Sequence, residues 1–541
     1  MPDVLIINAN VHTMDLSRPR AQSVLMRDGC IVMLGDGDYV RSHAGMGVKI
    51  INAGGRLVLP GFQDAHVHLL DGGTDLIQSA SLASATTLHE LQSALAAHAA
   101  QNASALVLGA GWRAAYFGDD TLHRGVLDAV LPDRPCLVFD DSGHCACLNS
   151  AALTLAGIGA ETPDPPNGHI VRDRAGTPAG MLHEDAIYWA RNRLPSISDA
   201  TYVQGAIAGQ TLANSLGITG VLDPAIAPYH ERAYSTLAAS GGMTLRVAGA
   251  AKIDPHDTAQ IVLARLTAMR SAHRTGYFQI QSAKFFLDGV LENRTAAMLA
   301  PYDDAVGGNA ALMFSPDQIA SLFTALDAAR FQIHVHVIGD GATCAALDGF
   351  AAALDANGCW PALHQLAHLQ VVDPADFARI AALGVMANIQ PLWAQYEPGD
   401  TDPTLAMIGP VRLPNTYAFR QMLSAGAAYC LSSDWSVTTM NPFEIIETAV
   451  TRQPPDCGRT TAFYPAERLS VAEAVSGYTH HAAAACWRGH FTGKLSPGYS
   501  ADLIIVDQDI LTCDPYDIGK TKVLLTLFQA REVYRHSSFE G

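Results

Sequence analysis

The stretch GFQDAHVH at residues 61–68 joins a short apolar run to two histidines that are two residues apart. In a β-strand, residues i and i+2 face the same side, so His66 and His68 should project together while Val67 faces away. Two imidazoles on one face are typical of a metal site, and two unrelated buried histidines are the plain alternative. The stretch therefore predicts a strand that ends in metal ligands.

Seven further apolar runs follow, each succeeded by an Ala-rich stretch with helical spacing. They lie at 217–223, 245–250, 280–288, 331–340, 364–372, 384–391 and 426–434. Eight such units predict an α/β fold, a (β/α)₈ TIM-like barrel over residues 61–488, in which functional groups gather at the carboxyl ends of the strands. Further residues of ligand type lie at these ends: Lys284, His336, His368 and Asp434.

Both ends of the chain are rich in short β-type runs broken by Asp-Gly and Gly-Asp turns. Neither end can bury a face alone, so residues 1–60 and 489–541 are predicted to form one β-sandwich. The interval between the first two barrel runs, about 70–215, is too long for a simple crossover and predicts an inserted α+β subdomain. Placed on the first βα loop, it should overhang the barrel mouth.

Composition narrows the classes of partner. The chain has 34 Lys plus Arg against 52 Asp plus Glu, a net charge of −18, which disfavours nucleic acids and anionic membranes. No run approaches the roughly 18 apolar residues of a membrane span, and no signal peptide is recognisable at the N-terminus. We expect a cytoplasmic protein with a small-molecule substrate, with a homodimer as one expected assembly.

The chain resembles the amidohydrolase superfamily, and most closely amidohydrolase family 3, the branch that includes N-substituted formamide deformylases. The resemblance runs from about Val4 to Tyr534. It is carried by DAHVH after a Pro-Gly, Lys284 in KFFLDG, His336 in HVIGD, His368 in HLQ, Gln390-Pro391, Asp434 in SSD, the closing GKLSPGYSADLIIVD, and GWR, GHCACLNS and GMLHE within the insertion.

This resemblance implies a centre of two divalent metal ions, zinc with manganese or cobalt as alternatives. Its ligands would be His66, His68, Lys284, His336, His368 and Asp434. His66, His68 and Asp434 would hold the more buried ion, and the two later histidines the more exposed one. Lys284 would bridge both ions as a CO₂-derived carbamate, because a desolvated lysine can become neutral.

The resemblance also implies a reaction, the cleavage of a non-peptide amide-type C–N bond by a metal-bound hydroxide. Asp434 would take the proton of the nucleophile and pass it to the departing amine. Three alternatives stay open: a cyclic amide hydrolase of the hydantoin or lactam type, a ring deaminase, and a non-catalytic metal-binding protein. Ring deaminases of this superfamily generally carry a Glu three residues after the histidine of the fifth strand. Here that position is Gly339, and the acid, Asp340, comes one residue later, so the deaminase is disfavoured.

Three ligand assignments have competitors. His334 shares a face with His336 in IHVHV, and His336 is preferred because it lies nearer the strand's carboxyl end. His364 precedes His368 by four residues and is expected to pack or to support a ligand. An ion pair with Asp288 is the alternative for Lys284.

Substrate-binding residues are expected in the insertion and beside Asp434. Trp112, His144 and Glu184 lie in motifs similar to those of the family, with core packing, a backbone-bonded turn and an ion pair with an Arg as their respective alternatives. Trp435 stands where relatives have a small residue. Together with Phe285, Phe286 and Trp393 it predicts an apolar or aromatic substrate.

Overall fold

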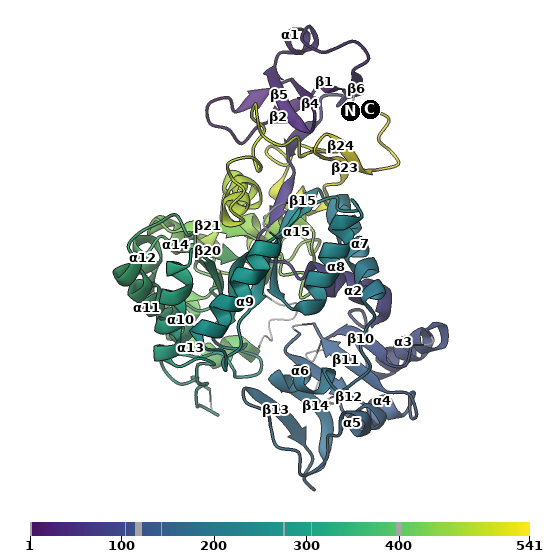
Figure 1. Cartoon of the computed structure of the whole chain (residues 1–541), viewed down its shortest axis with the longest axis vertical. Coiled ribbons are helices and arrows are strands. Elements are labelled where there is room, and N and C mark those ends of the chain that lie inside the picture. Colours follow the sequence, from purple (N-terminus) through teal and green to yellow (C-terminus); the bar gives the residue numbers. More distant parts are fainter. Residues whose placement is uncertain are drawn as a thin grey trace.

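The computed structural model describes residues 3–102, 104–113, 122–141, 143–273, 276–304, 306–396 and 403–541. Eight parallel strands form its central sheet, wrapped by helices (Figure 1). The strands are β8 (Phe62–Asp64), β15 (Ile218–Ile226), β16 (Arg246–Lys252), β17 (Phe278–Phe286), β18 (Gln332–Val337), β19 (Gln365–His368), β20 (Met386–Ile389) and β21 (Ala428–Leu431). Each of the eight predicted runs overlaps one of these strands, and the predicted barrel class is confirmed.

The first and last barrel strands are joined just beyond their ends. The Asp434 amide donates to the His66 carbonyl over 2.8 Å. The Asn388 side chain donates to the Ala65 carbonyl over 2.9 Å. These bonds close the ring of strands on the side where the chemistry-bearing residues lie.

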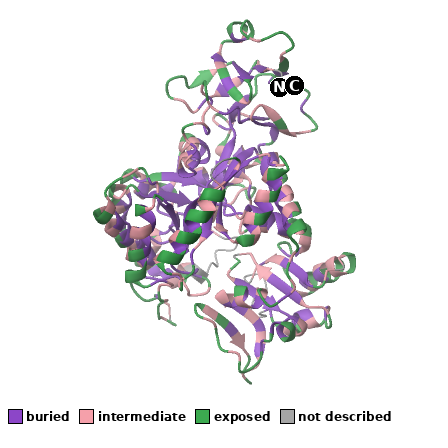
Figure 2. Cartoon of the chain, in the orientation of Figure 1, coloured by how far each residue is buried: buried purple, intermediate pink, exposed green. Residues whose placement is uncertain are grey.

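Alternation along the strands separates the barrel interior from the surrounding helix layer. In β18, Ile333, Val335 and Val337 belong to the large hydrophobic core between strands and helices. His334 and His336 have the opposite parity and therefore face inward. Figure 2 shows the strands buried and the outer helix faces exposed.

Five of the barrel helices begin at side chains that cap their free backbone amides. Ser198, Thr258, Ser315, Asp373 and Asn441 each accept a hydrogen bond from an amide of the first turn. The helices of this layer are α2 (Leu69–Gln78), α7 (Asp199–Ser215), α8 (Pro228–Ala239), α9 (Ala259–Ala272), α10 (Pro316–Ala328), α11 (Asp340–Asn357), α12 (Pro374–Ala382), α14 (Phe419–Ser424) and α15 (Pro442–Thr451).

An additional six-stranded sheet lies between α2 and α7 in the sequence, with strand order β13-β14-β12-β11-β10-β9. The two helices pack closely, since a Cβ added at Gly73 would lie 2.1 Å from the Gly205 carbonyl oxygen. Hydrophobic clusters cover both faces of the sheet. Its elements are β9 (Ser79–Ser81), α3 (Leu88–Gln101), β10 (Val107–Trp112), α4 (Arg124–Asp128), β11 (Cys136–Asp140), β12 (Cys145–Leu148), α5 (Ser150–Ala156), β13 (Gly168–Arg172), β14 (Pro178–Glu184) and α6 (Asp185–Arg191).

The two chain ends meet in one shared sheet, which packs on a second sheet of N-terminal strands, at the end of the molecule opposite the insertion (Figure 1). N-terminal β7 pairs antiparallel with C-terminal β22, and one hydrophobic cluster joins both sheets. One sheet has the order β5-β4-β1-β6 and the other β24-β23-β22-β7-β2-β3. Their strands are β1 (Val4–Ile7), β2 (Asn10–His12), β3 (Arg20–Ala21), β4 (Ser23–Arg27), β5 (Cys30–Gly35), β6 (Lys49–Asn52), β7 (Leu57–Pro60), β22 (Leu503–Val506), β23 (Val523–Phe528) and β24 (Arg531–Arg535).

Shorter elements complete the fold: α1 (Gly37–Arg41), η2 (Pro391–Trp393), α13 (Pro403–Arg412), η3 (Leu413–Asn415), η4 (Pro465–Glu467), α16 (Val471–Ser476), η5 (Gly477–His481), α17 (Ala482–Ala485) and η6 (Pro515–Lys520). Among the described residues, no helix is both long and apolar enough to cross a membrane.

Candidate active site

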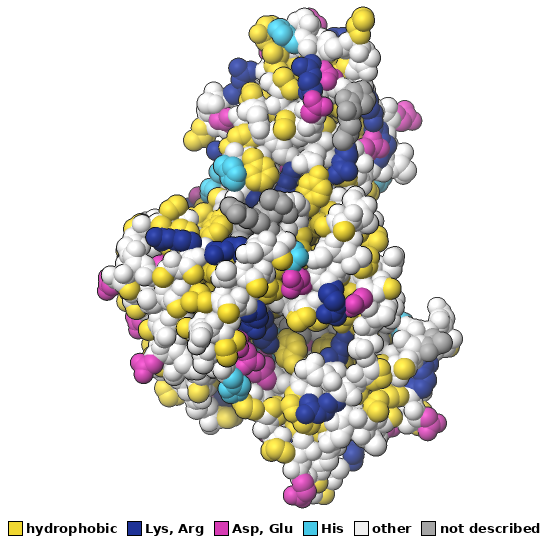
Figure 3. Space-filling view, viewed as in Figure 1, with side chains coloured by type: hydrophobic (Ala, Val, Ile, Leu, Met, Phe, Trp, Pro, Cys, Tyr) yellow, Lys and Arg dark blue, Asp and Glu magenta, His cyan; other side chains and the backbone are white. Residues whose placement is uncertain are grey.

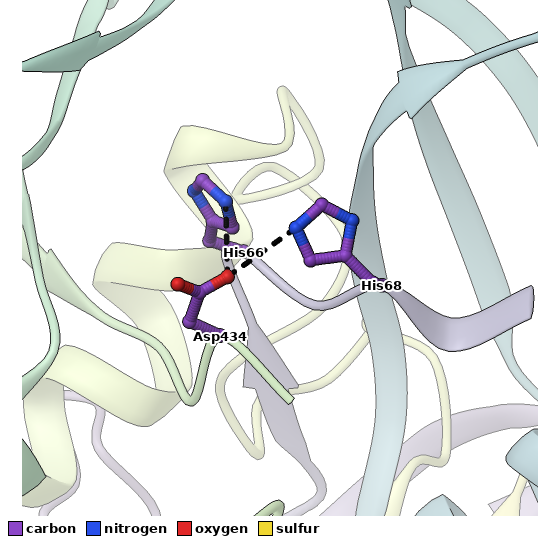
Figure 4. Close-up of side chains that lie close together, drawn as sticks. All are labelled: His66, His68 and Asp434. Atoms are coloured by element: carbon purple, nitrogen blue, oxygen red, sulfur yellow. Dashed lines mark ion pairs between the residues drawn. The ribbon is translucent and has the colours of Figure 1, made fainter. Parts of the chain in front are cut away.

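His66, His68 and Asp434 meet at the carboxyl end of the barrel. The Nε2 atoms of His66 and His68 lie 3.3 and 3.4 Å from the same oxygen of Asp434 (Figure 4). One donor atom from each of the three residues lies within 4.8 Å of the others, which is a spacing that a single cation can bridge. The His68 side chain remains 24% exposed, so this group opens toward the mouth of the barrel.

The local backbone around this group differs from the expectation. Strand β8 ends at Asp64, so His66 and His68 lie in the following loop and not in the strand itself. The Asp64 carboxylate accepts the amides of His66 and Ser433 over 3.2 and 3.1 Å. Hydrogen bonds to the Asp64 side chain thus take the place of backbone pairing between strands, and they link the loop after β8 to the loop after β21.

Lys284 lies in β17 with no solvent exposure. Among the described residues, its Nζ atom has no hydrogen-bond partner. Burial lowers the Lys284 pKa to about 7, against the opposing influence of Asp434, so the neutral amine is well populated near neutral pH. Asp288, the alternative ion-pair partner, instead accepts the amides of Ala297, Ile338 and Gly339.

His336 and His368 come from neighbouring strands, and their ring centroids are 4.4 Å apart. The Nε2 of His336 lies 3.0 Å from the Gly289 carbonyl oxygen. Because a carbonyl can only accept, Nε2 carries the proton and Nδ1 keeps a free lone pair. Nδ1 of His368 lies 3.8 Å from Asp434, which places this pair beside the His66–His68–Asp434 group.

Three imidazoles at this end of the barrel, those of His66, His336 and His368, are held in their neutral form. Burial lowers the pKa values of His66, His336 and His368 well below the usual range, and neighbouring positive groups add to the shift. A neutral imidazole is the form that binds metals.

The two competing histidines have other partners. Nε2 of His334 lies 2.9 Å from Nδ1 of His66, so His334 orients His66 from behind. His364 contacts Asp327 over 3.0 Å and accepts the Ile333 amide, near the opposite end of the strands. His364 is therefore part of a structural network.

The donor set fits a divalent metal ion. Within the described part of the chain, Lys284 Nζ, His368 Nδ1 and Asp434 Oδ1 are buried polar atoms without a hydrogen-bond partner. Such atoms in a native fold require an explanation, and a bound ion is one. Neutral imidazoles, a carboxylate and a neutral amine are donors suited to zinc, manganese or cobalt once the amine carries an anionic group.

The inserted sheet contributes a polar chain that reaches His336. His144 Nδ1 lies 2.8 Å from the Glu184 carboxylate, whose other oxygen accepts the Thr295 hydroxyl over 2.9 Å. Burial disfavours the charged form of His144, but Glu184 more than offsets this and raises the His144 pKa to about 9. The His144 ring lies 5.7 Å from the His336 ring, so it faces the candidate site.

Two backbone features hold the hydrogen-bonded group of His144, Glu184 and Thr295 in place. Glu184 has a φ of 53°, which non-glycine residues adopt only when their surroundings compensate. A Cβ at Gly289 would lie 2.6 Å from a Glu184 oxygen, so only glycine can present the carbonyl that holds His336 at this position.

The two predicted tryptophans occupy different surroundings. Trp112 is 3% exposed within a hydrophobic cluster of the insertion, a position that favours its alternative role in core packing. Trp435 packs against α2, where a Cβ at Gly72 would approach the indole to 2.6 Å. The Trp435 carbonyl accepts the His68 amide over 2.6 Å, so its backbone positions His68.

The aromatic residues expected in the pocket lie on two sides of the barrel strands: some are near the site and one is in the helix layer. Phe286 lies 5.3 Å from the His336 ring, and Trp393 stacks on His368 at 5.5 Å. Phe285 instead packs on Phe314 and Phe323 in the helix layer, so its expected place in the pocket is wrong. Adjacent strand residues point to opposite faces, and Lys284 already takes the inward one.

Sequence reasoning did not single out Asp64, Gly289, Thr295 or the contact between His334 and His66. Asp64 belongs to the DAHVH motif, so its proximity to His66 was a usable signal. Gly289 and Thr295 act through contacts with the distant insertion, for which the sequence contains no local pattern.

A closed parallel barrel whose inner carboxyl end carries imidazoles, a carboxylate and a buried amine defines a metal-dependent barrel hydrolase. The amidohydrolase family model matches residues 49–534. The chain therefore belongs to the amidohydrolase family and is a hydrolytic enzyme that acts on carbon–nitrogen bonds, as the sequence predicts.

Individual relatives span nearly the whole chain. Protein LONG AFTER FAR-RED 3 of Arabidopsis thaliana is 28% identical over 98% of this chain and 91% of its own length. N-substituted formamide deformylase of Arthrobacter pascens is 28% identical over 97% of each chain. An uncharacterized metal-dependent hydrolase from Pyrococcus horikoshii has the same fold, with a TM-score of 0.78 and 22% identity over 95% of this chain and 99% of its own.

Proposed function

We propose that this enzyme hydrolyses the amide-type C–N bond of a small apolar or aromatic molecule, an N-substituted formamide or a related amide. The observation that carries the proposal is the convergence of six donor side chains from five strands or their following loops at one end of the barrel. The identity of a full-length relative as an N-substituted formamide deformylase supports the choice of substrate class.

The proposed centre would take two divalent ions, zinc foremost, and the residues that would hold them are His66, His68, His336, His368, Asp434 and, as a carbamate, Lys284. When bound, such ions polarise a carbonyl group and lower the pKa of water to about 7. Asp434 lies between the two histidine pairs and is placed to take a proton from the attacking water. It then delivers that proton to the departing nitrogen, because an amine leaves readily only when protonated.

The substrate pocket is proposed to lie between the barrel mouth and the insertion. Figure 3 shows a hollow between these two parts, with hydrophobic side chains on its floor and charged side chains at its rim. Phe286 and Trp393 flank the two later histidines and would form an apolar wall. His144, fixed by Glu184, would donate a hydrogen bond to a polar atom of the substrate.

The ring-deaminase alternative is disfavoured by the place of Asp340. This acid follows Gly339, and its side chain accepts the Leu299 amide over 2.8 Å. Asp340 begins α11, and its hydrogen bond to the Leu299 amide disfavours a role as proton donor in the site. Cyclic amides share the same metal requirement and form the comparison panel of the experiment below.

Removing the metal should abolish hydrolysis of N-benzylformamide, because the carbonyl and the water both depend on it. We expect activity to fall at least about 100-fold after exhaustive dialysis against a chelator, and to return with zinc, manganese or cobalt. Metal content measured on the same samples should approach two ions per chain when activity is restored. Full turnover by protein shown to contain no metal would overturn the proposal, and turnover of hydantoins or lactams alone would favour the cyclic alternative.

Replacing His144 by Gln should lower kcat/KM by about 100-fold, the loss typical of one preorganised hydrogen-bond donor, with the metal content unchanged. The matched control is His169→Gln, which breaks an exposed His–Asp pair of 2.7 Å on the same insertion and should leave kinetics unaltered. Equal kinetics for the wild type and both variants would remove His144 from the proposed pocket.

A further inference from the structure

A second cavity lies at the opposite end of the barrel from the candidate active site. Its volume is about 310 Å³. It is lined by the start of β16, the start of β17, the segment that follows α17 and the turn between β23 and β24. Because Arg246 is the first residue of β16 and the active site lies beyond its last, the length of a strand separates the two regions. The proposed hydrolysis does not use this cavity.

Two guanidinium groups line the cavity, and they differ in their partners. Arg246 donates to the Asp502 carboxylate over 2.5 Å and to the Ser500 hydroxyl over 2.8 Å. The same carboxylate also accepts the Thr492 hydroxyl and the Gln529 amide. The Asp502 carboxylate is therefore already hydrogen-bonded by Arg246, the Thr492 hydroxyl and the Gln529 amide.

Arg488 has fewer hydrogen-bond partners, and the nearby Asp502 only partly offsets the cost of burying its charge. It is 2% exposed, and its Nη2 donates to the Val247 carbonyl over 2.9 Å. Its Nη1 has no hydrogen-bond partner among the described residues. Burial lowers the Arg488 pKa to about 10, so the group is still a cation at neutral pH. A buried cation with an unused donor is energetically unfavourable unless an anion binds beside it.

The walls of the cavity suit a flat apolar body. Tyr277, Trp487 and Phe491 contribute aromatic surface, and the Arg246 guanidinium lies 5.3 Å from the Phe491 ring centroid. The volume is at the lower end of the range typical of small-molecule sites. An inorganic anion alone would leave the aromatic surface without contact.

We propose that this cavity is a second ligand site, which binds a small aromatic carboxylate through Arg488. The carboxylate would accept from the unused Nη1 donor while the ring packs between the aromatic walls. An enzyme with a net charge of −18 repels anions in general, so the local guanidinium is what would permit such binding.

The test uses isothermal titration calorimetry on the full-length holoenzyme with benzoate, benzylammonium and inorganic phosphate as probes. We expect saturable benzoate binding that weakens at least 10-fold in Arg488→Met and less in Arg488→Lys, and no binding of benzylammonium at this site. A carboxylate can also bind an active-site metal, but that signal would not depend on Arg488. Benzoate affinity that is identical in the wild type and Arg488→Met overturns the proposal, as does Arg488-dependent binding of phosphate without benzoate.

A second pair of variants keeps the test decisive if Arg488→Met fails to fold. His490 is exposed at the rim of the cavity. Changing it to Glu adds a negative charge and should weaken benzoate binding at least 10-fold, whereas His490→Gln should have little effect. A crystal soaked with 4-iodobenzoate should show iodine between Trp487 and Phe491, and an iodine signal confined to the active site would contradict the assignment.

Discussion

Replacing Asp434 by Asn is expected to lower kcat/KM by at least about 1000-fold, because the change removes both a proton carrier and an anionic ligand. Asparagine keeps the shape of the side chain, so the fold should be retained. The carboxylate that both His66 and His68 approach within 3.4 Å is lost, and metal content should fall with activity. Steady-state kinetics and metal analysis on the same preparation measure both effects.

The control for this variant is Asp348→Asn, which changes a carboxylate that is 69% exposed on the outer side of α11. It should leave activity and metal content at wild-type levels. An Asp434→Asn enzyme that retains full activity would exclude the proposed proton transfer.

Replacing Lys284 by Met should eliminate activity, by at least about 1000-fold, without weakening the metal-free fold. Methionine fills nearly the same volume and removes an amine that has no hydrogen-bond partner among the described residues. The free energy of unfolding of the metal-free protein should therefore stay constant or rise by about 1 kcal/mol. Denaturant titrations of both proteins after chelation provide the measurement.

This pair of readouts separates the proposed bridge from the ion-pair alternative. If Lys284 neutralised Asp288, its loss would leave a buried carboxylate uncompensated and destabilise the fold by about 3–5 kcal/mol. A carbamate gives a further signature, a carbon-13 signal after incubation with labelled bicarbonate that Lys284→Met should lack. Wild-type activity in Lys284→Met would exclude the bridging role.

The barrel could be predicted because its evidence is local and repeated. Every barrel strand overlaps a predicted apolar run, and period-two alternation places His334 and His336 inside and Ile333, Val335 and Val337 outside. Alternation also explains the error at Phe285, whose neighbour Lys284 has the inward position. In DAHVH the same rule failed, because the Asp64 carboxylate ends the strand before the histidines are reached.

The remaining parts of the site depend on contacts between distant segments. His144 and Glu184 are separated by 40 residues, and Glu184 is linked to the segment that holds His336 through Thr295. Their motifs marked His144 and Glu184 as candidate substrate-binding residues, but no periodicity in the sequence predicts that the two side chains pair. The coordination of metals by the six predicted ligands stays a prediction, although the structure places their side chains at one end of the barrel.

The pairing of β7 with β22 has a consequence for how the protein is made. Gly61, which separates β7 from β8, donates its amide to the Asp502 carbonyl over 3.0 Å, only a few residues before the loop of His66 and His68. A ribosome synthesises Asp502 441 residues after Gly61. The first segment of the catalytic centre to emerge therefore waits for an anchor that is made much later, and a chain released between these two positions by a premature stop codon would lack it.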